Sequence, residues 1–101
     1  MRLVITVIQP SQVEAVRQAL ADVHVTRLTI CDAQGYDGES GRLVQQACVE
    51  IAVNEDFVER TVSTIVAALS LPGAGRSGQV FVMPLEESVQ LYREVRGSEA
   101  V

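Results

Sequence analysis

The residues best suited to bind a ligand lie in one glycine-rich stretch that runs into an apolar segment. Residues 71–84 read Leu-Pro-Gly-Ala-Gly-Arg-Ser-Gly-Gln-Val-Phe-Val-Met-Pro and hold three of the chain's seven glycines. Glycine has no Cβ to keep an anion away from backbone N–H groups, and Arg76 adds a positive charge. The stretch lacks the G-x-x-x-x-G-K-S/T spacing of a P-loop, so a plain turn is the alternative interpretation. The pattern indicates a candidate phosphate loop.

The bulk composition limits the class of protein. The chain has 101 residues, which predicts one domain, residues 1–101, with one hydrophobic core. A net charge of −5 argues against a nucleic-acid partner. No segment approaches the ~20 apolar residues of a membrane helix, so we expect no direct membrane insertion. The first residues continue into a strand pattern and do not resemble a signal peptide, which indicates a cytoplasmic protein. The sequence shows no set of residues typical of a catalytic site, so we expect that this protein is not an enzyme.

The apolar periodicity gives six elements in the order β-α-β-β-α-β. Ser11, with Glu14 three residues later, has the capping-box pattern that begins a helix, and Asn54 is the expected cap of a second helix. This order predicts a ferredoxin-like α+β fold, in which two helices cover one face of a four-stranded antiparallel sheet. The predicted strands are residues 2–9, 25–33, 43–53 and 79–83, the predicted helices are residues 12–22 and the segment that ends near Leu69, and a short helical turn is expected around residues 86–91.

The register of the central hairpin follows from its side chains if the turn is centred between Glu39 and Ser40. The predicted pairs are Leu28 with Ile51 and Ile30 with Val49 on the helix side, and Thr29 with Glu50 and Cys31 with Cys48 on the other side. Two interpretations of the cysteines stay open, namely small half-buried apolar residues or a redox-sensitive pair. The face away from the helices is too apolar to remain in water, so we expect an oligomer that covers it.

Several segments of the chain resemble the PII signal-transduction proteins. They are residues 1–10, 13–20, 28–30, 35–36, 49–53, 78–87 and 96–101. The resemblance implies a homotrimer that binds an adenine nucleotide in clefts between subunits. It also implies that a membrane transporter or a cytosolic enzyme is the regulated partner. The residues themselves indicate that the last part of the chain, about 91–101, is a mobile tail, because Gly97 and the polar residues around it leave little core to hold it.

The resemblance also assigns the binding residues. The nucleotide-binding residues that it implies are Thr29, Gly35, Tyr36, Glu50, Arg76, Ser77, Gly78, Gln79, Arg93 and Arg96. Arg76, Ser77 and Gln79 stand where the family has glycine, aspartate and lysine, and Gln90 and Tyr92 stand where it has two arginines. Arg93 and Arg96 are the expected replacements for those arginines. Because charged phosphate contacts are fewer, we expect ADP or AMP to bind better than ATP.

The loop between the second and third strands, about residues 35–42, is shorter than the family's and lacks its modified tyrosine. In this respect the chain resembles divergent short-loop PII-like proteins, some of which are associated with inorganic-carbon transport and carboxysomes. Arg42 and the N–H groups around Gly38 and Gly41 form a candidate site for an anion such as bicarbonate, and a solvated turn is the alternative.

Two other classes of function stay open. One is a trimeric metal-tolerance protein similar in shape to CutA, which requires Cys31, Cys48 and His24 to meet across subunits. The other is an interaction domain without a ligand, because ferredoxin-like folds serve many functions.

Overall fold

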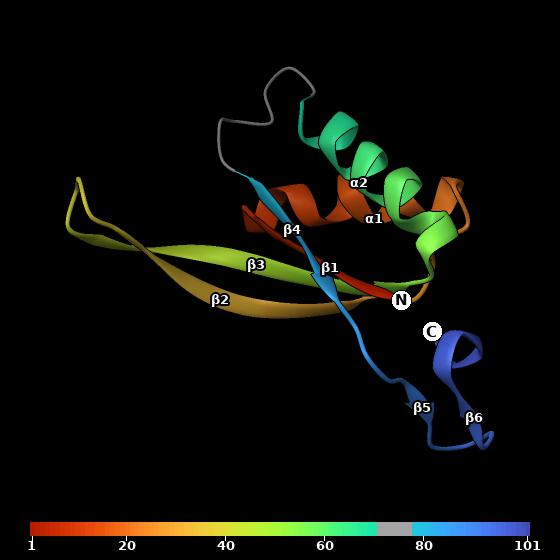
Figure 1. The fold of residues 1–101 in the computed structure, drawn as a ribbon. Coiled ribbons are helices and arrows are strands. Elements are labelled where there is room, and N and C mark those ends of the chain that lie inside the picture. The colour runs from red at the N-terminus through yellow and green to blue at the C-terminus, as the bar shows by residue number, and fades with distance from the viewer. Residues whose placement is uncertain (71–77) are drawn as a thin grey trace.

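The computed structural model describes residues 1–70 and 78–101. The predicted ferredoxin-like fold is confirmed: two helices lie on one side of a four-stranded antiparallel sheet with the strand order β2-β3-β1-β4 (Figure 1). The elements of this unit are β1 (Arg2–Ile8), α1 (Val13–Asp22), β2 (Thr29–Asp37), β3 (Arg42–Val53), α2 (Glu55–Leu69) and β4 (Gln79–Pro84). A two-stranded hairpin, β5 (Val89–Gln90) with β6 (Val95–Arg96), follows the sheet.

The core lies between the sheet and the helices, and the alternation of the strands creates it. From Val4 in β1 and from Ala47 in β3, every second residue faces the helices and is buried, as Val4 and Ile51 are. Each helix places residues four apart on its inner side, with Val16 and Leu20 on α1 and Thr61 and Ile65 on α2. The buried apolar residues are Val4, Ile8, Val16, Leu20, Val25, Ala47, Val49, Ile51, Val53 and Ile65.

The start of α1 differs from the prediction. A short 3-10 helix (Pro10–Gln12) precedes α1, and Ser11 does not cap the helix. The side-chain oxygen of Gln12 accepts the Gln9 N–H at 2.9 Å, so Gln9 and Gln12, and not Ser11, make the hydrogen bond at the start of this turn. Pro10 explains the earlier start, because its fixed φ is already close to the helical value, so the helical turn begins at Pro10.

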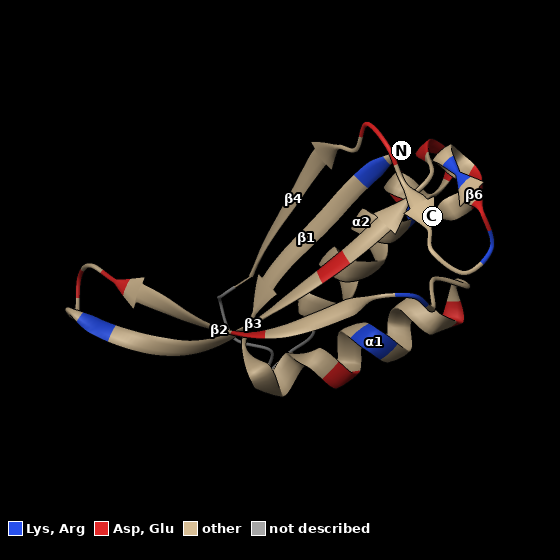
Figure 2. Ribbon diagram, turned by 90° about the horizontal axis from the view of Figure 1, so that it is seen from below, with Lys and Arg blue, Asp and Glu red and all other residues tan. Residues whose placement is uncertain are grey.

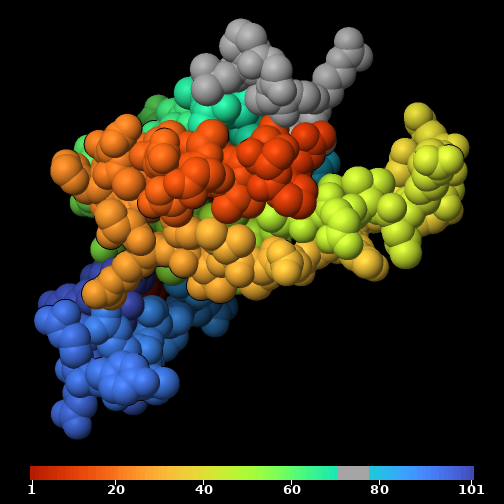
Figure 3. Space-filling model, turned by 180° about the vertical axis from the view of Figure 1, so that it is seen from behind, coloured from red at the N-terminus to blue at the C-terminus, as the bar shows by residue number. Residues whose placement is uncertain are grey.

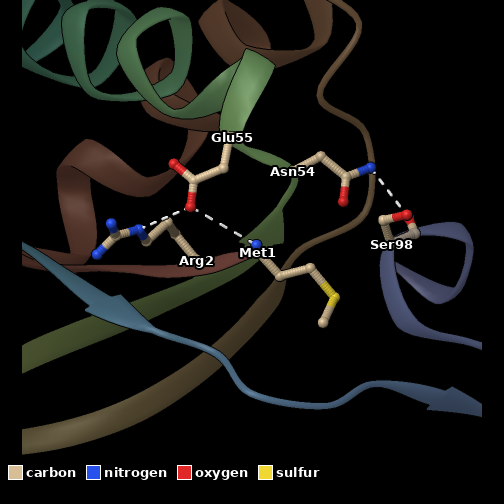
Figure 4. Close-up of polar contacts among 5 residues, drawn as sticks. All are labelled: Met1, Arg2, Asn54, Glu55 and Ser98. Atoms are coloured by element: carbon tan, nitrogen blue, oxygen red, sulfur yellow. Dashed lines mark hydrogen bonds and ion pairs between the residues drawn. The ribbon is translucent and has the colours of Figure 1, made fainter.

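The start of α2 ties three parts of the chain together (Figure 4). Asn54 occupies the predicted N-cap position, but its side-chain amide donates to the Ser98 carbonyl at 3.0 Å instead of capping. The next residue, Glu55, accepts a 2.9 Å hydrogen bond from Arg2 Nε and lies 3.6 Å from the Met1 amino group. The Arg2 hydrogen bond holds the pKa of the Glu55 carboxyl below its usual value. The end of the chain and β1 are thus both connected to this helix.

β2 and β3 form a long antiparallel hairpin. The pairs Ile30–Val49, Thr29–Glu50 and Cys31–Cys48 confirm the predicted register, whereas Leu28 precedes the strand. The predicted loop was too long, because residues 34–37 belong to β2 and only residues 38–41 form the turn. The sequence did not indicate this part of the strand, because residues 34–37 do not alternate between apolar and polar side chains. β3 pairs with β1 only from Ala47 onward. Residues 33–46, which we call the ribbon, therefore project beyond the sheet (Figures 1 and 3).

The expected helical turn around residues 86–91 is wrong, because the chain forms the β5–β6 hairpin there. Val89 and Val95 are β-branched and favour a strand. The Gly97 N–H donates to the Ser88 carbonyl at 2.8 Å and holds the two strands together. Gly97 has a φ of 67°, which leads into the final 3-10 helix (Gly97–Ala100). Mobility of this tail stays a prediction.

Two neighbouring residues of α2 test the position of the core. Ile65 is fully buried, whereas Val66 is 49% exposed. Ile65→Ala leaves a cavity and should lower the free energy of unfolding by about 2–5 kcal/mol. Val66→Ala is the matched control and should change it by less than about 0.5 kcal/mol. Chemical denaturation of both variants measures the difference, and equal effects would contradict this placement of the core.

Candidate functional site

The sheet face away from the helices is largely apolar, and no element of the described residues covers it. Phe81 and Met83 are 46% and 44% exposed, and Ile5 of β1 lies beside Phe81. Strand alternation places the following residues on this face, which we call the open face: Leu3, Ile5, Val7, Thr29, Cys31, Cys48, Glu50, Ala52, Gln79, Phe81 and Met83. β1 and β4 carry little charge in the view from below (Figure 2).

The residues of the open face form rows across the sheet. One row contains Thr29, Glu50, Ile5 and Phe81, and the next row contains Cys31, Cys48, Val7 and Gln79. The predicted ligands Thr29 and Glu50 are therefore cross-strand partners, and Gln79 lies one row away toward the ribbon. The structure places these three residues on one surface.

Thr29 and Glu50 line a hollow of ≈ 380 Å³. Its other lining residues are Thr26, Arg27, Leu28, Ala52, Ala100 and Val101. A hydroxyl and a carboxylate can hydrogen-bond the hydroxyl or amino groups of a ligand, and Arg27 adds a positive charge. The sequence did not single out Arg27 or the two C-terminal residues, because only the returning tail brings the latter to the hollow.

Gly35 and Tyr36 lie on the ribbon and not in this hollow. Gly35 is six residues from Thr29, which is about 20 Å along a strand. A Cβ on Gly35 would lie 2.3 Å from the Gln46 side-chain oxygen, so the Gln46 side chain crosses this glycine. Tyr36 is 71% exposed and lies opposite Leu43. The role of Gln46 was not apparent from the sequence.

The end of the predicted phosphate loop is described from Gly78, whereas Arg76 and Ser77 lie outside the described residues. A Cβ on Gly78 would lie 2.9 Å from a Leu69 methyl group, and its φ of 156° also favours glycine. The Gln79 carbonyl accepts a 2.9 Å hydrogen bond from the Thr6 hydroxyl, which fixes the start of β4.

Arg93 and Arg96 are not close to Gly78 and Gln79, the described end of that loop, within one chain. They belong to the β5–β6 hairpin, which follows the far end of β4 and projects from the sheet (Figures 1 and 3). The predicted phosphate ligands that the structure describes therefore lie beyond opposite ends of β4. No single chain joins the described ones into one site.

The candidate anion turn already contains a carboxylate. Asp37 accepts the Glu39 N–H at 3.0 Å, the Ser40 hydroxyl at 2.8 Å and, through its carbonyl, the Gly41 N–H at 2.8 Å. The Ser40 and Glu39 hydrogen bonds hold the pKa of Asp37 below its usual value. These contacts occupy the Gly41 N–H, so the bicarbonate prediction depends on Arg42 and Gly38.

His24 is separated from the cysteines. It lines a second cavity, of ≈ 240 Å³, with residues that include Asn54, Phe57 and Val101. Among residues 1–70 and 78–101, no group of three or more His, Cys, Asp and Glu side chains is arranged to hold a metal ion. In the same residues, neither helix is long and apolar enough to span a membrane.

Comparisons with known proteins agree with this geometry. Residues 1–95 match the family "Nitrogen regulatory protein P-II". The chain is 32% identical to the nitrogen regulatory protein GlnK1 of Methanosarcina mazei over 114 positions, which cover 100% of this chain and 97% of that protein. It is 26% identical to a P-II protein of Rhizobium etli, with full coverage of both. The chain therefore belongs to the P-II family of signal-transduction proteins.

A solved structure extends the similarity to three dimensions. The structure of Arabidopsis thaliana PII bound to citrate superposes with a TM-score of 0.84 and 26% identity, covering 98% of this chain and 87% of that one. The alignment with the Methanosarcina protein spans 114 positions, whereas this chain has 101 residues, so that relative has segments without a counterpart here. In this chain the turn between β2 and β3 has only four residues, 38–41.

Asp37→Ala tests the turn of the ribbon. The pKa of Asp37 is lowered in the folded chain. Its carboxylate therefore stabilises the folded turn fully above the ordinary pKa of 3.8, and this stabilisation is lost as the pH falls through the lowered pKa of the folded chain. At neutral pH the substitution removes the bonds to Glu39 and Ser40, so amide hydrogen exchange at the ribbon tip should become several times faster. Glu39→Ala is the control in the same turn and should leave exchange unchanged, and equal exchange in both variants would contradict this role.

Proposed function

We propose that this chain is a homotrimeric regulatory protein that binds an adenine nucleotide in clefts between subunits. The bound nucleotide favours one conformation of the protein, and that conformation contacts a membrane transporter or a cytosolic enzyme. The protein acts by binding, in the cytoplasm, and not as an enzyme. Membership of the P-II family supports the regulatory role.

The separation of the predicted ligands carries this proposal. Gln79 lies at the start of β4, whereas Arg93 and Arg96 lie on the hairpin that follows the other end of that strand. A second copy of the chain can bring its hairpin to the first copy's open face. A site between copies needs such a division, because each copy supplies a different part of it.

The open face supports an assembly of several copies. Its apolar side chains, among them Ile5, Phe81 and Met83, have no covering layer within the described chain. An antiparallel sheet with one solvated face normally alternates apolar and polar residues, and this sheet does not. Burying these side chains between copies removes apolar surface from water and stabilises the assembly.

The phosphate end of the site favours ADP or AMP over ATP. Gln79 is neutral where the family resemblance implies a lysine, and Tyr92 stands in place of an arginine. A lost hydrogen bond to a charged group costs about 1.5–3 kcal/mol, so a triphosphate loses more than a diphosphate. Arg76 offsets part of the loss, since a guanidinium can bind a phosphate through two hydrogen bonds. Bicarbonate as a second effector stays a prediction on which this proposal does not depend.

Isothermal titration tests the nucleotide site. ADP and AMP should bind more tightly than ATP, and Glu50→Gln should weaken ADP binding roughly ten- to hundredfold because it removes a charged hydrogen-bond acceptor. Glu59→Gln is the matched control, since Glu59 is exposed on α2 and on the other side of the sheet.

Two results would contradict the proposal in different ways. No heat with ADP, AMP or ATP would exclude the nucleotide. Equal ADP affinity in Glu50→Gln and the unsubstituted protein would show that the site lies elsewhere.

A further inference from the structure

The two cysteines lie where the ribbon leaves the sheet. Ala47 is the first residue of β3 that pairs with β1, through Ile8. Cys48 follows it and pairs with Val7 on one side and with Cys31 on the other. Residues 42–46 of β3 pair with β2 alone. The Cys31–Cys48 pair therefore joins the two strands at the root of the ribbon, one row inside the sheet.

The register brings the two thiols within reach of each other. Directly opposed residues of an antiparallel pair have Cα atoms about 4.5–5.5 Å apart. A disulfide needs a Cα separation of about 4.4–6.8 Å, so the backbone need not move far. Both cysteines are free, and in the single chain, without other copies over the open face, Cys31 is exposed and Cys48 is half-buried. Burial, Glu50 and Cys31 together raise the pKa of the Cys48 thiol, in agreement with this proximity.

The reduced ribbon depends on its own strand pairing alone. A two-stranded hairpin without a further layer is marginally stable in water. The polar turn at Asp37 holds the tip, but the described structure shows no packing layer between the tip and the sheet, and Tyr36 and Leu43 are largely exposed. A covalent bond at the root would close a loop of the chain and remove conformations in which the two strands separate.

We propose that Cys31 and Cys48 are a redox modification site, forming a reversible disulfide that fixes the root of the ribbon. The oxidant is a peroxide. The Cys31 thiolate attacks one oxygen of hydrogen peroxide, which breaks the O–O bond and gives a sulfenic acid and, after protonation of the departing hydroxide, water. The Cys48 thiol then loses its proton as its sulfur attacks the Cys31 sulfur and displaces hydroxide, and that proton converts the hydroxide to a second water. Two thiols and one hydrogen peroxide thus give one disulfide and two waters. A dithiol reverses the reaction by exchange. The inference does not depend on nucleotide binding.

Trypsin separates the two cysteines and makes the bond measurable. Cleavage after Arg27, Arg42 and Arg60 places Cys31 in residues 28–42 and Cys48 in residues 43–60. After treatment of the purified chain with stoichiometric hydrogen peroxide, the intact single-chain mass should fall by two hydrogen atoms. A non-reducing digest should contain these two peptides linked together, and dithiothreitol should separate them. Cys31→Ser and Cys48→Ser are the controls and should give no such linked pair.

Hydrogen exchange measures the effect on the ribbon in the unsubstituted protein. Amides of residues 33–46 should exchange several times more slowly in the oxidised form than in the reduced form, whereas amides of α2 should not change. Three results would overturn the proposal: both thiols remaining open to alkylation after peroxide, a linkage found only between chains on a non-reducing gel, or equal ribbon exchange in both forms.

Discussion

The sheet has two apolar faces, and its two helices cover only one of them. On the helix side, alternate residues of β1 and β3 pack against Leu20 and Ile65 and form a closed core. On the other side, Phe81 and Met83 remain nearly half exposed. The remaining features of the molecule follow from this asymmetry. The open face needs a covering layer, the candidate ligands Thr29 and Glu50 lie on it, and the hairpin with Arg93 and Arg96 projects away from the sheet.

The sequence predicted the parts of the fold that depend on apolar alternation. The register of the central hairpin followed from placing Ile30 opposite Val49, because a shift of one residue would turn both toward the wrong face. The same register predicted Thr29 and Glu50 as cross-strand partners. The family resemblance, stated on scattered short segments, agrees with the match over residues 1–95.

The missed features depend on contacts that have no apolar period. Residues 34–37 do not alternate between apolar and polar side chains, and only their pairing with Arg42–Gln45 shows that they form a strand. Ser11 has the sequence of a cap, but Pro10 begins the turn first and Gln12 supplies the contact. The β5–β6 hairpin and the position of Ala100 and Val101 beside Glu50 depend on the fold of the tail, which local propensity did not indicate. Arg76 and Ser77 lie outside the described residues, so their part in the site remains a prediction.

Sedimentation equilibrium of the unliganded protein at micromolar concentration tests most directly whether copies of the chain cover the open face. The expected result is one species of three times the 10.9 kDa chain mass, with no dependence on nucleotide. A monomer of 10.9 kDa under the same conditions would contradict the assembly and, with it, a binding site shared between copies.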